Sequence, residues 1–205
     1  MASVLRERGW DARTMLLFPY GDRTRNWFMQ VREIRHDMLL RPGRQARSIG
    51  GGRIAGPMRS AWRGGLFILI GHSGGGIAGL HAIQRWDDHL QEQLTGLSRF
   101  VLVGSPKSPV PRKWQPRTMH IGAWRKGAVP ADPIVRLGTW GGWEQAQSGR
   151  LPRWNPLLYA PGTRQRLELI GGHPDYFRSR PPYVDGAGRS NLDKLMECIL
   201  NWMNV

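Results

Sequence analysis

The sequence has a single cysteine and no long apolar run. Cys198 cannot form an internal disulfide, and no second thiol is present to complete a metal cluster. No apolar stretch approaches the ~18 residues that a membrane-spanning helix needs. The first residues, MASVLRERGW, lack the apolar core of a secretory signal. These absences predict a cytoplasmic protein with no disulfide, no metal centre and no transmembrane segment.

Acidic residues are also scarce. The chain has 15 Asp and Glu against 30 Lys and Arg, which gives a net charge of +15, and only four of the basic residues are lysines. Clustered cations favour nucleic acid or anionic membranes because binding releases counterions. The arginines, however, are spread from Arg6 to Arg189, with no basic helix face and no run of five like charges. We therefore predict no specific nucleic-acid partner and only weak, nonspecific attraction to anionic surfaces.

The length of 205 residues and the hydrophobic content of 40% fit one domain with a substantial core, spanning 1–205. Short apolar runs predict strands over 14–20, 65–71, 99–104, 118–124 and 166–170. The run at 65–71 is apolar on both faces, as is typical of a central parallel strand.

Helical periodicity fills the intervals between these strands. The first predicted helix is capped by Asp22 or Thr24 and turns four apolar side chains inward: Trp27, Val31, Ile34 and Met38. A second helix ends near Trp62, and a third spans 76–86. The last helix begins with the capping box Ser190–Asp193 and turns another four side chains inward: Leu192, Leu195, Ile199 and Trp202. Alternation of strand and helix predicts an α/β fold, with a mostly parallel sheet covered by helices on both faces.

One junction between strand and helix, LFILIGHSGGGIAGLHAIQRW, has a serine among glycines. Gly71-His72-Ser73-Gly74-Gly75 fits the G-x-S-x-G pattern of a nucleophile elbow, in which a sharp turn strains the serine backbone and exposes its hydroxyl. We expect Gly71 and Gly75 to be glycines because side chains there would collide with the turn. The amide of Gly74, at the helix start, would point toward a developing oxyanion.

Two other interpretations of this segment are a plain glycine-rich turn and a phosphate cradle at a helix N-terminus. The lysine of a Walker motif does not follow these glycines, although Gly74, Gly76 and Gly79 have the G-x-G-x-x-G spacing. We prefer the nucleophile interpretation because the serine stands where the predicted strand meets the predicted helix.

A nucleophilic serine needs a base and an orienting acid, which on such a sheet follow in the order Ser, Asp or Glu, His. Asp132 is the only acidic residue between Trp124 and Glu144, in the segment after a predicted strand. His173 lies three residues beyond the strand predicted at 166–170. We predict Ser73 as nucleophile, His173 as base and Asp132 as acid.

Competing residues fit this arrangement less well. Asp175 is an alternative acid, although it follows the same strand as the histidine. The remaining histidines lie before the serine, beside it, on the helix behind it or inside a strand, and are assigned structural or surface roles: His36, His72, His81, His89 and His120.

With these residues, nearly the whole chain resembles the α/β-hydrolase superfamily. LLFPYGDRTRNW resembles the FPYDWR region of lipase-like and lecithin:cholesterol acyltransferase-like members, and VLVGSPKSPVP resembles their GTP segment. The resemblance implies acyl-transfer chemistry on an ester, thioester or related acyl group, with neither metal nor organic cofactor. Ser73 would attack the acyl carbon, His173 would take and return the proton, and Asp132 would hold the imidazole.

The chain departs from this family at its start. Family members usually have an earlier strand whose following loop supplies the second oxyanion amide. Either that strand is missing, or the loop Pro19-Tyr20-Gly21-Asp22 has replaced it, in which case an amide of Tyr20, Gly21 or Asp22 should lie about 5 Å or less from the Ser73 hydroxyl. Gly21 is the preferred donor. If the strand is missing, an uncovered sheet edge beside 14–20 should expose Leu16, Leu17 and Phe18.

The large apolar side chains between acid and base do not determine which substrate the protein binds. These residues either line an acyl pocket, form a small lid, or anchor core and loops: Trp140, Trp143, Trp154, Leu157, Leu158 and Tyr159. The leading prediction is a serine hydrolase, an esterase or lipase-like enzyme acting on a small acyl-ester substrate. The alternatives are an acyltransferase or thioesterase with the same triad, and a catalytically weak α/β-hydrolase-like protein that binds a partner or an anionic polymer through its arginines.

Overall fold

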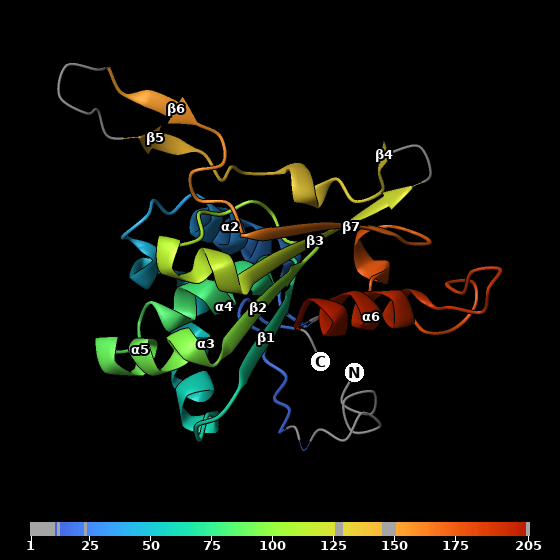
Figure 1. The fold of residues 1–205 in the computed structure, drawn as a ribbon, viewed down its shortest axis with the longest axis horizontal. Helices are drawn as coiled ribbons and strands as arrows, with labels where there is room; N and C mark the ends of the chain where they lie inside the picture. Colours follow the sequence, from blue (N-terminus) through green and yellow to red (C-terminus); the bar gives the residue numbers. More distant parts are fainter. Residues whose placement is uncertain (1–10, 12, 23, 126–128, 145–150, 204–205) are drawn as a thin grey trace. The chain divides into compact units, whose positions relative to one another are not determined.

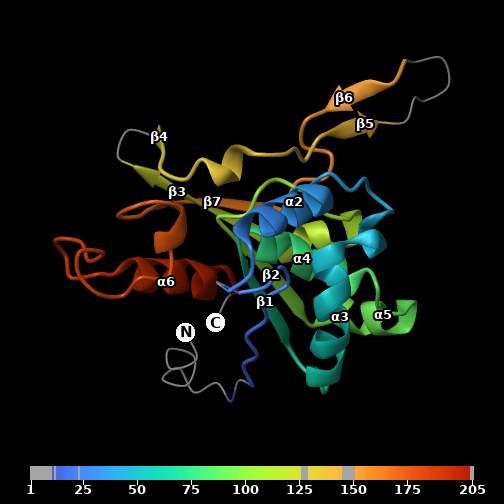
Figure 2. The ribbon, with the colours of Figure 1, turned by 180° about the vertical axis from the view of Figure 1, so that it is seen from behind.

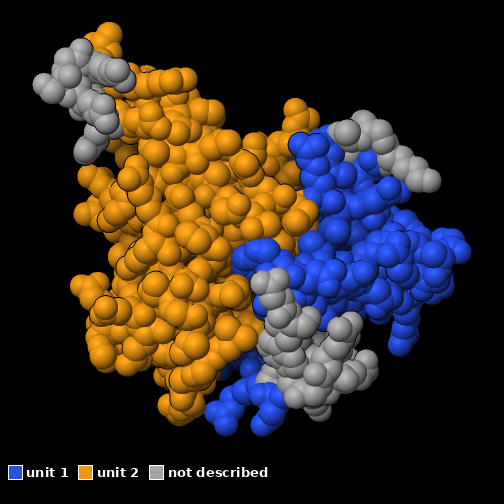
Figure 3. Space-filling model, in the orientation of Figure 1, with its two compact units in different colours: residues 1–17, 122–133, 166–205 blue, residues 18–121, 134–165 orange. Residues whose placement is uncertain are grey.

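The computed structural model describes residues 11, 13–22, 24–125, 129–144 and 151–203. The chain forms two compact units, drawn in orange and blue in Figure 3. The larger, orange unit comprises Phe18–Ile121 and Ile134–Gln165. The smaller, blue unit comprises Met1–Leu17, Gly122–Pro133 and Arg166–Val205. Whether they act as the predicted single domain stays a prediction.

The fold is α/β, and its main strands run parallel. These strands are β1 (Phe67–His72), β2 (Ser98–Val103) and β3 (Thr118–Arg125), with β1 paired to β2 and β2 to β3. Two further strands pair with β3: the short antiparallel β4 (Val129–Pro130) and β7 (Thr163–Glu168). The parallel pairing places the ends of β1 and β2 side by side, with His72 opposite Val103.

Helices of the larger unit are layered on one side of β1 and β2, as Figures 1 and 2 show from opposite sides. They are α2 (Trp27–Met38), α3 (Ile49–Ala61), α4 (Gly74–Ile83) and α5 (Asp88–Gly96). Helix α4 packs against the two strands and also against α2 and α3, so nine of its ten residues are buried. The helix that carries the serine turn is thus the central layer of this unit.

Two other segments complete the described chain. Strands β5 (Gly142–Glu144) and β6 (Arg153–Asn155) form a separate antiparallel hairpin that projects from the larger unit (Figure 1). In the smaller unit, α6 (Asn191–Met203) begins with the predicted capping box. The Ser190 amide donates to Asp193 Oδ2 at 2.9 Å, and the Asp193 amide donates to Ser190 Oγ at 3.1 Å. Short 3-10 turns lie at Gln45–Arg47, Arg112–Arg117, Ile134–Arg136 and His173–Asp175.

Most predicted elements are confirmed with shifted ends. Helix α4 begins two residues before the start of the predicted range 76–86 and ends three residues before its end. Strand β7 begins three residues before the predicted range 166–170. On α6, Leu195 and Ile199 are buried as expected, whereas Leu192 and Trp202 are only half-buried. Met196, Leu200 and Met203 complete the buried face.

The predicted strand over 14–20 is wrong. The segment has no strand in the structure, and no described strand pairs with it. A strand needs a neighbour to satisfy its backbone groups, and Pro19 removes one donor. Leu16 is 77% exposed and Phe18 58% exposed, while Leu17 is half-buried. Strand β1 pairs with β2 alone among the described residues and is half-buried along most of its length.

The predicted inward face of α2 is wrong at Trp27 and Val31, whereas Ile34 and Met38 on the same predicted face are half-buried. The residues that this helix buries are Glu33 and Asp37, whereas Trp27 is 73% exposed and Val31 51% exposed. Its cap is Asn26, whose side chain accepts from the Phe28 amide at 2.9 Å, rather than Asp22 or Thr24. The buried carboxylates have partners far away in the sequence, and these partners determine which face is covered.

Candidate active site

A sharp turn joins β1 to α4, and Ser73 stands at its centre. Ser73 has φ 55° and ψ −134°, and it is the only residue other than glycine with positive φ in the described chain. Its amide donates to the Val103 carbonyl of β2 at 3.0 Å, so the turn is tied to the neighbouring strand. A side chain in this backbone region is strained, and such strain persists where the surrounding structure enforces it. The predicted strand–serine–helix turn is confirmed.

Close backbone packing explains one of the two predicted glycines. A Cβ on Gly71 would come within 2.6 Å of the Gly76 amide nitrogen, so this position has no room for a side chain. Gly75, in contrast, has open space around the position of a Cβ, and the prediction for it is wrong. Gly76 is the second restricted position, because a Cβ there would clash with Ser105 Oγ and lie 3.1 Å from Leu102 Cδ2.

Gly74 is the first residue of α4 and is crowded for a different reason. A Cβ there would lie 2.7 Å from Ile34 Cγ1 and 3.0 Å from Tyr20 Cε2. The first amides of a helix have no acceptor within the helix, and the helix dipole makes them favourable to negative charge. Gly74 thus has the position expected for an oxyanion donor, and whether its amide acts as one stays a prediction.

The smaller unit holds the predicted acid and base in direct contact. His173 Nδ1 and Asp132 Oδ2 are 2.8 Å apart. The Asp132 side chain is completely buried, whereas the His173 side chain is 25% exposed. A buried carboxylate on one ring nitrogen fixes the tautomer, with the proton on Nδ1 and the basic lone pair on Nε2. This is the pairing that orients an imidazole for general-base catalysis.

Asp175, the alternative acid, has another role. Its Oδ2 accepts from the Gly172 amide at 2.9 Å, and its Oδ1 lies 3.7 Å from Arg178 Nε. Asp175 therefore closes the turn that presents His173, and the histidine ring bonds Asp132 instead.

Tyr176 is a partner of Asp132 that sequence reasoning missed. Its hydroxyl donates to Asp132 Oδ2 at 2.8 Å and accepts from the Ala123 amide at 2.7 Å. Burial, followed by the nearby charge of Asp132, raises the pKa of Tyr176 well above its usual range, so the hydroxyl stays a donor. Asp132 Oδ2 is thus held by two donors, one from the tyrosine and one from the histidine. The segment GGHPDYF contained the residue, but no spacing rule connects a tyrosine to an acid 44 positions earlier.

The hydrogen bonds of the 19–22 loop do not identify a second oxyanion donor. Gly21 has φ 92°, the positive value for which a glycine is suited, and its amide donates to the Phe18 carbonyl at 3.1 Å. That bond closes a tight turn and occupies the amide of the preferred candidate. Tyr20 is buried beside Gly74, whereas Asp22 is exposed and accepts from the Thr24 amide. A donor role for Tyr20, Gly21 or Asp22 stays a prediction.

The tryptophans between acid and base divide into two groups. Trp140 is buried, with its ring edge-on to His120 and Lys107 above it. Trp143 and Trp154 make an edge-to-face contact across the β5–β6 hairpin with ring centroids 5.5 Å apart, and both are exposed. Trp140 is therefore a core anchor, whereas the hairpin pair is available to solvent.

The other histidines are predicted to have structural or surface roles, and three of them make hydrogen bonds outside the Asp132–His173 pair. His36 bonds Asp37, His89 bonds Gln93, and His120 bonds the Ser105 carbonyl. His81 is buried in α4, and His72 is the last residue of β1.

The described residues contain neither a cluster of metal-binding side chains nor a helix that could span a membrane. No group of three or more His, Cys, Asp or Glu side chains among them is arranged to hold a metal ion. None of the helices in the described ranges has both the length and the apolar character required to cross a bilayer.

Ser73 thus belongs to the larger unit, and the Asp132–His173–Tyr176 cluster to the smaller one. No family model matches the sequence, and comparisons with curated proteins and with solved structures also return no match.

Proposed function

We propose that the protein is a serine hydrolase with a compact α/β-hydrolase fold, and that it cleaves small carboxylic esters. The observation that carries the proposal is the backbone of Ser73, strained at the turn between a parallel strand and a buried helix. Strained residues cluster at functional sites, and this turn raises a hydroxyl above the carboxyl end of a strand. A glycine at this position would avoid the strain, so the presence of serine favours a chemical role.

The Asp132–His173 pair supports the same proposal independently. The acid follows β3 and β4, the base follows β7, and the serine follows β1, which is the chain order of this class of hydrolase. The hydrogen bond between the acid and the base is formed. A histidine held this way in a partly exposed loop is suited to accept a proton from a serine.

The proposed reaction needs no further reactant than ester and water. Ser73 Oγ attacks the acyl carbon as its proton passes to Nε2 of His173, and the tetrahedral oxyanion is stabilised by the Gly74 amide. The C–O bond to the alcohol breaks, and the alcohol leaves with the proton from His173. Water then attacks the acyl-enzyme with His173 as base, which releases the carboxylic acid and restores Ser73.

Labelling with a fluorophosphonate probe, followed by hydrolysis of p-nitrophenyl esters of increasing acyl length, tests the proposal. Ser73→Ala and His173→Ala should lose labelling and turnover. Ser60→Ala, which changes an exposed serine of α3, is the matched control and should keep both. Labelling that survives in Ser73→Ala, or a wild-type protein that neither reacts with the probe nor hydrolyses any ester, would reject the proposal and favour a binding protein.

A further inference from the structure

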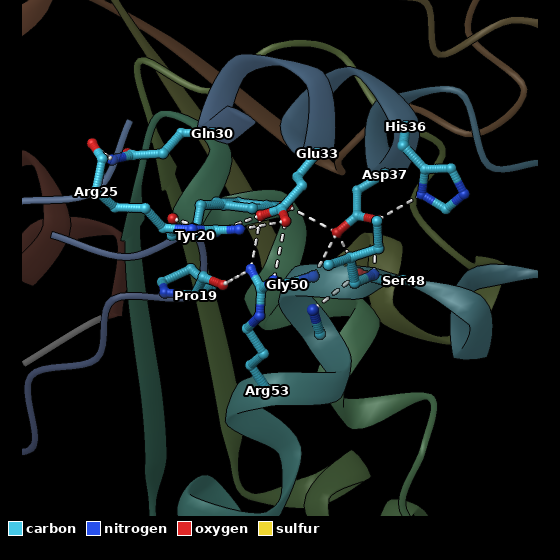
Figure 4. A network of polar contacts seen from close by, with 12 residues as sticks. Pro19, Tyr20, Arg25, Gln30, Glu33, His36, Asp37, Ser48, Gly50 and Arg53 are labelled. Atoms are coloured by element: carbon cyan, nitrogen blue, oxygen red, sulfur yellow. Dashed lines mark hydrogen bonds and ion pairs between the residues drawn. The ribbon is translucent and has the colours of Figure 1, made fainter. Parts of the chain in front are cut away.

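Tyr20 lies between a buried carboxylate and the residue that follows Ser73. Its hydroxyl donates to Asp37 Oδ2 at 2.9 Å (Figure 4), and the whole side chain is buried. Another edge of the same ring packs on Gly74, where a Cβ would lie 3.0 Å from Tyr20 Cε2. A single rigid ring therefore connects α2 to the start of α4.

Asp37 is held firmly at the other end of this connection. Its carboxylate is completely buried and also accepts from Ser48 Oγ at 2.5 Å and from the amides of Ile49 and Gly50, each at 2.8 Å. His36 Nδ1 lies 3.0 Å from Oδ1. Burial opposes ionisation, yet the hydrogen bonds from Ser48, His36 and the two amides outweigh it and lower the pKa of Asp37. Burial and the charge of Asp37 raise the pKa of Tyr20, so its hydroxyl remains a donor.

The backbone of the Tyr20 loop is held by a second set of charges. Arg53 Nη1 donates to the Pro19 carbonyl at 3.1 Å, and Arg25 Nη1 donates to the Tyr20 carbonyl at 2.8 Å. Both guanidinium groups also bind Glu33 with two hydrogen bonds each, and together they lower the pKa of Glu33 to about 2. In Figure 4, Arg25 reaches this carboxylate from the left and Arg53 reaches it from below. Two successive carbonyls are thereby fixed, and the tyrosine ring has little freedom to move.

We propose that Tyr20 is a positioning residue for the nucleophile, and that its hydrogen bond to Asp37 holds the ring against Gly74 and so sets the direction of the Gly74 amide. Buried charges add little net stability, because desolvation offsets their attraction, but they can impose one geometry. The geometry imposed here is that of the turn at the start of α4. The inference rests on the proposed function, since the Gly74 amide matters to catalysis only if Ser73 is the nucleophile.

The central test is Tyr20→Phe, which keeps the ring and removes only the hydroxyl. Turnover of a p-nitrophenyl ester should fall by about 10-fold or more with KM nearly unchanged. A misplaced amide donor stabilises the transition state less well but does not change how tightly the substrate binds. A second readout does not need hydrolysis. In a Ser73→Cys, Cys198→Ala background, the rate of alkylation by iodoacetamide is followed against pH.

A thiol beside the start of a helix has a lowered pKa, and its reactivity reports the direction of the nearby amides. Adding Tyr20→Phe to this background should raise the midpoint of the alkylation profile by about half a pH unit, which corresponds to roughly threefold slower alkylation below the midpoint. The matched control is Ser48→Ala, which removes a hydrogen bond from the same oxygen of Asp37 and the cap of α3. It should lower the melting temperature at least as much, while the alkylation profile and KM stay unchanged.

The outcomes separate the two proposals. An unchanged alkylation profile in Tyr20→Phe, or an equal shift in Ser48→Ala, would overturn the positioning role whether or not the protein hydrolyses esters. A shift confined to Tyr20→Phe in a protein that does not react with the fluorophosphonate probe would support the positioning role and reject the proposed function.

Discussion

Replacing Ser73 with glycine is expected to stabilise the protein while removing the nucleophile. A side chain at φ 55° and ψ −134° costs about 1–3 kcal/mol, which glycine avoids. Glycine also increases the conformational entropy of the unfolded chain, which lowers the free energy of unfolding by roughly 0.4–1 kcal/mol. The balance is a gain of about 1 kcal/mol in the free energy of unfolding, or an increase of roughly 2–4 °C in melting temperature for a chain of this size.

Ser73→Ala is the reference for this measurement, because alanine removes the hydroxyl but keeps the Cβ and hence the strain. Urea unfolding of both variants and the wild-type protein should place Ser73→Ala close to the wild type and Ser73→Gly above both. A glycine variant no more stable than the alanine variant would show that the turn stores no strain at this residue, and the observation behind the proposed function would lose its force.

Three further predictions concern other parts of the structure. Gly71→Ala should be strongly destabilising, by about 2 kcal/mol or more, whereas Gly75→Ala should be neutral or slightly stabilising in the same urea titration, because only Gly71 lacks room for a Cβ. Burial lowers the pKa of His81 to about 4, so the unfolded state takes up the proton first as the pH falls below ~6.5, and up to about 3 kcal/mol of stability should be lost between pH 6.5 and 4. His81→Leu should flatten this pH dependence, and an unchanged slope would contradict the assignment. Tyr176→Phe should cost about 1–3 kcal/mol in unfolding free energy and lower turnover, because Asp132 and the Ala123 amide both lose a partner, and a variant with wild-type values of both would exclude that role.

The parts of the site that could be predicted are those encoded locally. A strand, a serine in a glycine-rich turn and a helix follow one another within 21 residues, and the backbone requirement of such a turn limits the residues that can form it. The pairing of Asp132 with His173 could be anticipated because each falls in a loop after a strand, and their catalytic roles stay predictions. The prediction failed at Gly75 because the second glycine of the motif falls where a Cβ has open space. The next residue, Gly76, is the one whose surroundings leave no room for a Cβ.

The parts that could not be predicted depend on distant partners. Apolar periodicity assigned the inner face of α2 to its hydrophobic residues, but Glu33 and Asp37 are covered because Arg53, Tyr20 and Ser48 reach them from other segments. Burying an ionised carboxylate is favourable only when such partners are present, and no local pattern reveals them. The strand predicted at 14–20 failed for a related reason, since strand formation depends on a neighbour as well as on composition.

The buried carboxylates also change how the charge of the protein is displayed to solvent. Four acidic residues are buried among the described residues: Glu33, Asp37, Asp132 and Asp175. Salt screens charges beyond about 10 Å at 0.1 M, so a large particle or polymer senses the local surface rather than the total charge. That surface has fewer exposed carboxylates between its arginines than the composition indicates. The protein should therefore bind to a cation-exchange resin at low ionic strength and be released as the salt concentration rises.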